Sequence, residues 1–317
     1  MITVYTDAHK AHNPPYEIYD GKLTPYAESA DRAEAIVAAL QVNQLGTIMA
    51  PRQFAAHHIR AVHQQAYIDF LRQRSQGLKT DEILYPSYFM SDTYAPVTAN
   101  TYAAARAAVN AALTGAQLVL DGEPVVYSLC RPPGHHAGHH AMGGYCYFNN
   151  AAIAAQYMSV KGRVAILDID FHHGNGTQDA FYDRDDVLYI SIHADPRTRY
   201  PYSSGFRSER GHSKGRGYTH NFPLAIGTSD MQYLKTLQRA LKEVTDFRPD
   251  FLVVSAGFDT FVADPIGGFS LSSDIYKDIA EQINMLHLPT LLIQEGGYNV
   301  AYLGTLVANF LTGFGRI

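Results

Sequence analysis

The most reactive stretch of this sequence is residues 164–176, where a short apolar run ends in two carboxylates and two imidazoles. Asp168, Asp170, His172 and His173 follow in the pattern Asp-x-Asp-x-His-His, with glycines directly after them. Burying ionised carboxylates is unfavourable unless a cation or dense hydrogen bonding offsets the lost hydration. Mixed aspartate and histidine ligands suit Zn(II) or Fe(II) better than Mg²⁺ or Ca²⁺, which prefer oxygen alone. The segment favours a divalent metal site over a structural ion-pair cluster.

Three further apolar runs, residues 125–129, 251–255 and 290–293, also lead into polar side chains. The groups that follow them are two imidazoles, a carboxylate and a phenol: His135 and His136, Asp259, and Tyr298. A neutral imidazole can take a proton from bound water near neutral pH. In open parallel α/β sheets, sites form just beyond the carboxyl ends of the strands. We therefore expect these groups to meet in one site.

The elements that would position these groups alternate along the chain. Apolar residues spaced by three and four, or alanine-rich composition, predict helices at residues 31–40, 101–120, 231–245 and 272–286. Residues 2–6 and 186–192 resemble strands, as do the four runs above. Such alternation predicts βα units and a parallel sheet. No linker or repeat divides the sequence, which predicts a single α/β domain over residues 1–317.

The motif series as a whole resembles that of the zinc-dependent histone deacetylase superfamily. The matching segments are, in order, residues 131–136, 143–150, 168–176 and 191–193, Asp259, and residues 295–298. Residues 7–10, 17–21 and 32–34 are similar to the bacterial acetylpolyamine amidohydrolase branch. The resemblance implies an arginase-deacetylase fold, with a mostly parallel central sheet of about eight strands flanked by helices. It also implies a hydrolase that removes acetyl groups from acetylated polyamines or related N-acetyl alkylamines, releasing acetate and the free amine.

The resemblance implies two kinds of bound metal ion. Asp170, His172 and Asp259 match the ligands of one Zn(II) per chain, with Fe(II) as an alternative in vivo. Three protein ligands leave coordination open for a water and the acetyl oxygen, as in catalytic zinc sites. Such an ion acidifies the water and polarises the amide carbonyl. A structural K⁺ or Na⁺ site is implied at Asp168, Asp170, His172, Ser191 and Ile192.

The resemblance also implies a catalytic role for each of several residues. His136 matches the general base that deprotonates the water and then protonates the leaving amine. His135 matches the neighbouring imidazole, which Asp168 orients. Asn175 stands where some relatives carry an aspartate. An amide there would stabilise the imidazolium of His136 less than a carboxylate does. Tyr298 matches the phenol that donates to the developing oxyanion.

The resemblance assigns a further set of residues to substrate binding. Tyr145 and Tyr200 match the aromatic pair that walls a narrow tunnel for an alkylammonium or lysine-like chain. Gly144 would offer its carbonyl to the substrate amide N–H. Asp92 resembles a rim aspartate that binds the substrate backbone in protein deacetylases. Ile266 occupies a position where a polyamine-selective relative has a glutamate, and it cannot attract a distal ammonium.

Alternative functions stay open at this point. A peptide acetyl-lysine deacetylase is favoured by Asp92 and by the short segment 77–96, where the polyamine branch has a long insertion. A binuclear manganese ureohydrolase of the same fold would need further carboxylates, whereas Phe171 and Phe258 stand beside the ligands. A non-enzymatic acetyl sensor would not need Tyr298 in addition to a base and a metal site.

Composition sets the remaining expectations. Hydrophobic residues make up 46% of the chain and charged residues 17%, as in ordinary globular proteins. A net charge of -5 without a long basic run predicts no nucleic-acid partner. No apolar stretch approaches the length needed to span a membrane, so we expect no membrane partner. With two cysteines, Cys130 and Cys146, we expect reduced thiols and a cytoplasmic enzyme. The partner expected is a small acetylated amine or acetyl-lysine peptide, and homo-oligomerisation stays open.

Overall fold

The computed structural model describes residues 1–315 and is built around one eight-stranded sheet. The strand order is β4-β1-β5-β10-β9-β6-β7-β8, and every neighbouring pair is parallel. The strands are β1 (Ile2–Val4), β4 (Thr47–Met49), β5 (Val125–Ser128), β6 (Val164–Asp168), β7 (Val187–Ala194), β8 (Thr219–Leu224), β9 (Phe251–Ala256) and β10 (Thr290–Gln294). The sequence prediction of a mostly parallel sheet of about eight strands is confirmed.

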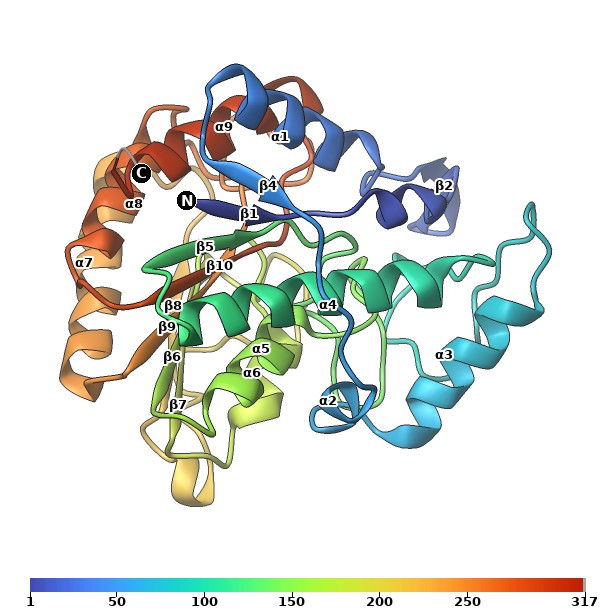
Figure 1. Cartoon of the computed structure of the whole chain (residues 1–317), viewed down its shortest axis with the longest axis horizontal. Coiled ribbons are helices and arrows are strands. Elements are labelled where there is room, and N and C mark those ends of the chain that lie inside the picture. Colours follow the sequence, from blue (N-terminus) through green and yellow to red (C-terminus); the bar gives the residue numbers. More distant parts are fainter. Residues whose placement is uncertain (316–317) are drawn as a thin grey trace.

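Helices cover both faces of this sheet (Figure 1). One layer contains α1 (Asp31–Val42), α7 (Asp230–Phe247), α8 (Ile275–Asn284) and α9 (Val300–Thr312). The other contains α4 (Thr101–Leu120), α5 (Asn150–Met158) and α6 (Asn175–Phe181), with α2 (His57–Arg60) and α3 (Gln65–Gly77) beyond them. Ala165 and Leu167 of β6 pack in the first core, whereas Val164 and Ile166 pack in the second. Because successive side chains face opposite layers, both of which are apolar, the central strands are continuous apolar runs.

The predicted helices are all present, with small shifts of their ends. The alanine-rich segment 101–120 forms α4 with the predicted limits, and α8 begins three residues later than the predicted segment 272–286. α7 begins at a capping box, in which Ser229 and Gln232 satisfy each other's backbone N–H groups. The sequence analysis missed β8, an edge strand that carries polar residues and Pro223. It also did not identify α5 and α9, which follow motif loops.

The expectation that no apolar stretch approaches membrane-spanning length needs correction. Within residues 1–315, α4 is long and apolar enough to cross a bilayer, with a mean hydropathy of 1.2. However, 72% of that window is buried inside the fold, where α4 packs against α5 and the sheet. A helix buried between layers can be apolar all round for this reason alone.

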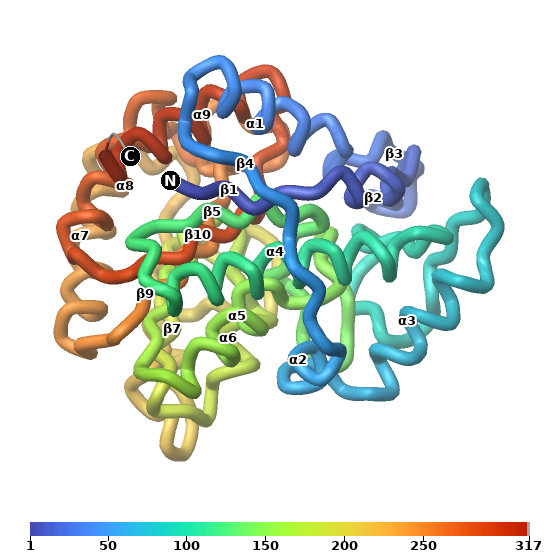
Figure 2. The backbone as a smooth tube through the Cα atoms, viewed as in Figure 1, coloured from blue at the N-terminus to red at the C-terminus, as the bar shows by residue number. Residues whose placement is uncertain are grey.

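A small hairpin and one long connection lie together at one end of the molecule (Figure 2). The hairpin pairs β2 (Tyr16–Tyr19) with β3 (Lys22–Pro25), and the 3₁₀ helix η1 (Asp7–Ala11) leads into it from β1. The connection is the segment 78–100, which follows α3. Thr93 Oγ1 donates to the carbonyl oxygen of Ile18 at 2.6 Å, and the Tyr85 hydroxyl donates to that of Tyr16 at 3.2 Å. The hairpin and the segment 78–100 therefore form one surface.

Candidate active site

The polar groups singled out from the sequence meet at the carboxyl ends of four adjacent strands. β5, β10, β9 and β6 are neighbours in the sheet, in that order. The loops that follow them carry the two imidazoles, the phenol and the carboxylates of the motif series. The expectation that these groups form one site is therefore met by the strand order, which no sequence pattern specified.

Asp170, His172 and Asp259 offer three ligand atoms within 4.8 Å of one another. Nδ1 of His172 lies 2.9 Å from Oδ2 of Asp259 and 3.5 Å from Oδ1 of Asp170. Backbone N–H groups fix the carboxylates, since Phe171 donates to Asp259 at 2.9 Å and Gly296 donates to Asp170 at 2.8 Å. The three side chains are thus held with their ligand atoms converging, which fits one ion of the kind that binds two carboxylates and an imidazole.

Two glycines make this convergence possible. A Cβ on Gly296 would stand 2.5 Å from Oδ2 of Asp170 and 2.7 Å from Oδ2 of Asp259. A Cβ on Gly257 would stand 2.1 Å from Oδ2 of Asp170. Any side chain at either position would displace a carboxylate, so the backbone of β9 and β10 approaches the ligands directly.

The charges of this cluster also suit a cation. Asp170 and Asp259 are at most 1% exposed. Burial, and then the charge of Asp170, raise the pKa of Asp259 to about 7. Burial opposes protonation of His172, but Asp170 and Asp259 outweigh it and raise the pKa of that imidazole to about 9. A protonated imidazole thus offsets the charge of the carboxylates in the absence of a metal. A divalent cation would take over that role and let His172 act as a neutral ligand.

His135 and His136 differ in their partners. Nδ1 of His135 lies 3.1 Å from Oδ2 of Asp168, which also accepts a hydrogen bond from the Tyr189 hydroxyl. Nδ1 of His136 lies 2.8 Å from Oδ1 of Asn175, so it donates to an amide oxygen and leaves Nε2 free to accept. Burial, and then the charges of neighbouring imidazoles, lower the pKa of His136 well below its ordinary value. His136 is therefore a neutral imidazole because of burial and its neighbouring imidazoles, and the hydrogen bond to Asn175 opposes this lowering of its pKa.

The loop that carries Tyr298 is held by charged side chains. Arg32 donates to the carbonyl oxygens of Gly297 and Glu295, each at 2.6 Å, and its guanidinium lies 4.7 Å from the centroid of the Tyr298 ring. Asp264 accepts a hydrogen bond from the backbone N–H of Tyr298 at 2.6 Å. Gly297 has φ +116°, a conformation that other residues rarely adopt. Arg32 and Asp264 therefore determine where the phenol stands.

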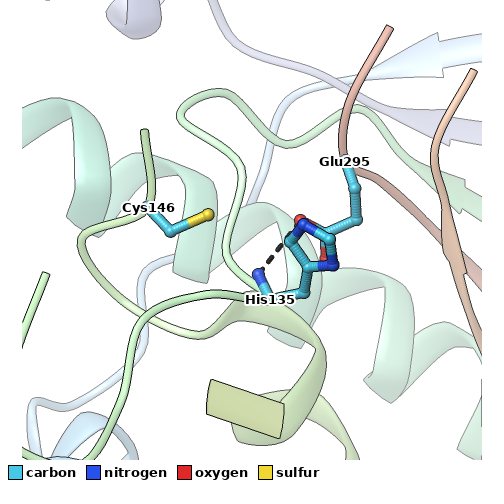
Figure 3. Close-up of side chains that lie close together, drawn as sticks. All are labelled: His135, Cys146 and Glu295. Carbon is cyan, nitrogen blue, oxygen red and sulfur yellow. Dashed lines mark hydrogen bonds between the residues drawn. The ribbon is translucent and has the colours of Figure 1, made fainter. Parts of the chain in front are cut away.

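A second group of potential ligand atoms comes from His135, Cys146 and Glu295, whose side chains lie close together (Figure 3). Oε2 of Glu295 accepts from the backbone N–H of Gly134 at 2.7 Å and from that of His135 at 3.2 Å. Burial raises the pKa of the Cys146 thiol well above its ordinary value, and the thiol is 3.3 Å from the carbonyl oxygen of Gly144. A protonated thiol is a poor ligand and these atoms already have partners, so Glu295 ties two catalytic loops together.

Glu295 and Asp264 are site residues that the sequence analysis missed. Glu295 directly follows a buried strand and precedes two glycines, which is the same signal that pointed to Asp168. Asp264 carried no such signal, because it lies in an irregular loop between β9 and α8. Cys130 and Cys146 are both buried and free, as expected.

The residues assigned to substrate binding gather around the catalytic groups. The ring of Tyr145 lies 5.4 Å from that of Tyr298, and the ring of Tyr200 lies 4.8 Å from that of His136. Ile266 packs against the cluster that contains Tyr145 and Tyr298. The structure therefore places aromatic and apolar surface beside both His136 and Tyr298.

Asp92 has several partners within the protein. Its carboxylate accepts from the backbone N–H of Gly144 at 3.0 Å, from the Tyr200 hydroxyl at 2.7 Å and from the backbone N–H of Tyr94 at 2.8 Å. The first two of these bonds join the segment 78–100 to the loops that carry Gly144 and Tyr200. Asp92 is thus a structural residue of the substrate site, whatever contact it also makes with a ligand.

We expect Asp92→Ala to reduce kcat/KM by about 10- to 100-fold for acetylputrescine and for an acetyl-lysine peptide alike, because hydrogen bonds to a charged group stabilise by about 1.5–3 kcal/mol. Tyr200 and Gly144 would lose a shared partner, which affects any substrate. Steady-state kinetics on the two substrates measure this effect. A loss confined to the peptide would show instead that Asp92 acts only by binding the substrate backbone.

Comparison with known proteins places this arrangement in a family. A model described as "Histone deacetylase domain" matches residues 26–314. The chain is 43% identical to acetylpolyamine amidohydrolase 2 of Pseudomonas aeruginosa over 99% of this chain and 98% of that protein. It is 38% identical to the acetylpolyamine amidohydrolase of Mycoplana ramosa over 99% of each chain. The crystal structure of acetylpolyamine aminohydrolase from Burkholderia pseudomallei superimposes with a TM-score of 0.95 at 37% identity, over 99% of this chain and 98% of that chain.

Proposed function

We propose, from the premise that this chain belongs to the histone deacetylase family, that it removes acetyl groups from acetylated polyamines or related N-acetyl alkylamines by metal-dependent hydrolysis. The observation that carries the proposal is the convergence of a metal-ligand set, a neutral imidazole and a phenol at one sheet edge. Relatives that are 37–43% identical over nearly the whole chain are acetylpolyamine amidohydrolases, which favours acetylated amines as the substrate class.

The proposal includes one Zn(II) per chain at Asp170, His172 and Asp259, with Fe(II) as the alternative in vivo. Its support is the donor set, whose ligand atoms converge and whose two carboxylates are buried. When bound, such an ion polarises the amide carbonyl and lowers the pKa of a water. A K⁺ or Na⁺ ion is also proposed, supported by the sheet register, which pairs Asp168 with Ser191. The residues that would hold it are Asp168, Asp170, His172, Ser191 and Ile192.

The side chains divide the reaction between them. His136 takes the proton from the attacking water at Nε2 and delivers it to the nitrogen of the leaving amine, while Asn175 holds Nδ1. His135, next to it, is oriented by Asp168. The Tyr298 hydroxyl donates to the carbonyl oxygen as negative charge develops there, and Arg32 keeps its loop in place. Acetate and the free amine are the products.

The substrate range is tested by kinetics on acetylputrescine, acetylcadaverine, acetylspermidine and an acetyl-lysine peptide, measured side by side. We expect all three acetylated amines to be hydrolysed, the peptide to be hydrolysed measurably, and the preference between the classes to be modest. Exposed carboxylates at the rim of the substrate tunnel contribute weakly to the binding of a distal cation, about 1 kcal/mol per contact. Ile266 offers no charge, and it packs against Tyr145 and Tyr298. An enzyme that hydrolysed the peptide but none of the amines would be the alternative acetyl-lysine deacetylase.

We also propose that residues 1–317 form one deacetylase domain. Its support is the central sheet, which includes strands from β1 near the amino terminus to β10, after which only α9 follows in the described chain. The packing of α1 against α9 joins the two ends further, because these helices belong to the same layer (Figure 1).

A further inference from the structure

We propose that Tyr94 and Tyr19 form a binding subsite for the distal ammonium of an acetylated amine. The subsite lies at the outer end of a row of aromatic rings that begins at the catalytic residues. The inference rests on the proposed deacetylase function and adds a specific place for the substrate's second, charged nitrogen. We call Tyr145, Tyr200, Tyr94 and Tyr19 the aromatic row.

The inner end of the aromatic row contacts the catalytic groups. Tyr145 stands beside the phenol of Tyr298 and Tyr200 beside the imidazole of His136, with ring centroids 5.4 Å and 4.8 Å apart. Tyr145 is 6% exposed, so methylene groups next to it would be shielded from water. An acetyl group at the catalytic residues would therefore direct its alkyl chain along these two rings.

Tyr94 continues the row outward. Its ring centroid is 6.1 Å from that of Tyr145 and 6.0 Å from that of Tyr200, so it bridges the two inner rings. Tyr19 follows at 5.9 Å from Tyr94 and is 51% exposed. The row therefore runs from nearly buried rings to solvent. A diamine whose acetylated end is at the catalytic groups would bring its other end toward Tyr94 and Tyr19.

The surroundings of this outer pair suit a cation. Asp20 directly follows Tyr19, and Asp92 accepts the backbone N–H of Tyr94. Burial raises the pKa of Tyr94 to about 12, with further contributions from Tyr19, Asp92 and Asp20. The phenol is therefore neutral at any working pH and stands among carboxylates. The faces of two neutral tyrosine rings attract an ammonium, more strongly where water is partly excluded.

A third carboxylate lies deeper in the same region. Glu17, which is 4% exposed, accepts a hydrogen bond from the Tyr145 hydroxyl at 3.0 Å and from the backbone N–H of Ala27 at 3.3 Å. Burial raises the pKa of Glu17 to about 7, so near neutral pH it is only partly ionised and adds part of a negative charge beneath the row. Lys22 stands opposite Tyr19 in the hairpin and is exposed, so its charge opposes the effect of the carboxylates at the outer end.

A pair of amides that differ only in charge tests the subsite. N-acetylputrescine and N-pentylacetamide have the same shape, with an ammonium in one and a methyl group in the other. We expect the enzyme to favour the charged amide in kcat/KM. Tyr94→Leu should lower that preference by about 5- to 30-fold, mainly through KM for acetylputrescine, because it removes one aromatic face from the cation. Tyr94→Phe keeps the ring and should restore the preference.

Two further variants serve as controls. Tyr88→Leu alters an exposed tyrosine of the same segment whose ring contacts Phe70 and Phe89 instead, so the preference should stay as in the natural protein. Lys22→Gln removes a competing positive charge and should strengthen the preference or leave it unchanged. A weakened preference in Lys22→Gln would contradict the expected sign of the electrostatic effect.

The outcomes separate the subsite from the reaction itself. Equal hydrolysis of the charged and neutral amides by the natural enzyme would overturn the subsite while leaving the deacetylase function intact. An equal loss on both amides in Tyr94→Leu would overturn it too, because Tyr94 would then act only through the shape of the site. If the metal-loaded protein hydrolysed neither amide nor any acetylated amine, the proposed function would fail, and the subsite with it.

Discussion

Asp259→Ala is expected to lose its divalent metal and all measurable hydrolysis of acetylputrescine while the chain remains folded. The side chain supplies one of three converging ligand atoms and is fully buried, so no neighbouring group can replace it. Its removal weakens both the charge balance and the geometry of the set. Metal analysis of the purified protein, together with circular dichroism and turnover, measures the three parts of this prediction.

The matched control for this experiment is Asp121→Ala. Asp121 is exposed at the carboxyl end of α4 and precedes β5, so it lies at the opposite end of the strands from the site. Its removal should change neither metal content nor turnover. In the natural protein, stripping the metal with a chelator should abolish hydrolysis and re-adding Zn(II) should restore it. Full activity in thoroughly metal-free protein would refute the proposed mechanism.

Tyr298→Phe is expected to lower kcat by about 100- to 1000-fold, the range found when one donor to an oxyanion is removed. The ring should stay in place, because Arg32 lies over it and Tyr145 packs beside it. Metal content should therefore equal that of the natural protein. A lowered kcat with an unchanged metal content would distinguish the loss of transition-state stabilisation from the loss of the metal. Steady-state kinetics and metal analysis measure these two quantities.

Tyr302→Phe is a suitable control for the loss of a hydroxyl in the same region. Tyr302 lies in the first turn of α9, four residues after Tyr298, and its side chain is 49% exposed. Its kcat should be unchanged. Near-normal kcat in Tyr298→Phe would show that the phenol does not donate to the oxyanion, and would leave the ring as a packing residue only.

Much of the fold was determined by local patterns in the sequence. The runs that became β5, β6, β9 and β10 were recognisable because strands buried on both faces are continuously apolar. The helix over residues 101–120 was recognisable from its alanine-rich composition. The ionised groups at the ends of these strands indicated a metal site because buried charges require compensation. The family resemblance then implied Asp170, His172 and Asp259 as its ligands.

The partners of these residues were decided only by the tertiary structure. Arg32 holds the carbonyl oxygen of Gly297, which is 265 positions away in the chain, and Glu295 holds the backbone of Gly134, which is 161 positions away. Asp92, expected at a rim, proved to join the loops of Gly144 and Tyr200.

Periodicity and composition report how one segment is buried, but not which segment lies against it. The strand order β5-β10-β9-β6 brings the catalytic loops together, and the packing of the hairpin against the segment 78–100 brings Tyr19 to Tyr94. Both depend on the packing of whole layers, which lowers the free energy of the complete fold and of no single segment. For that physical reason the sequence alone could predict a set of reacting groups, whereas the tertiary structure decided which side chains hold them and which aromatic rings stand beside them.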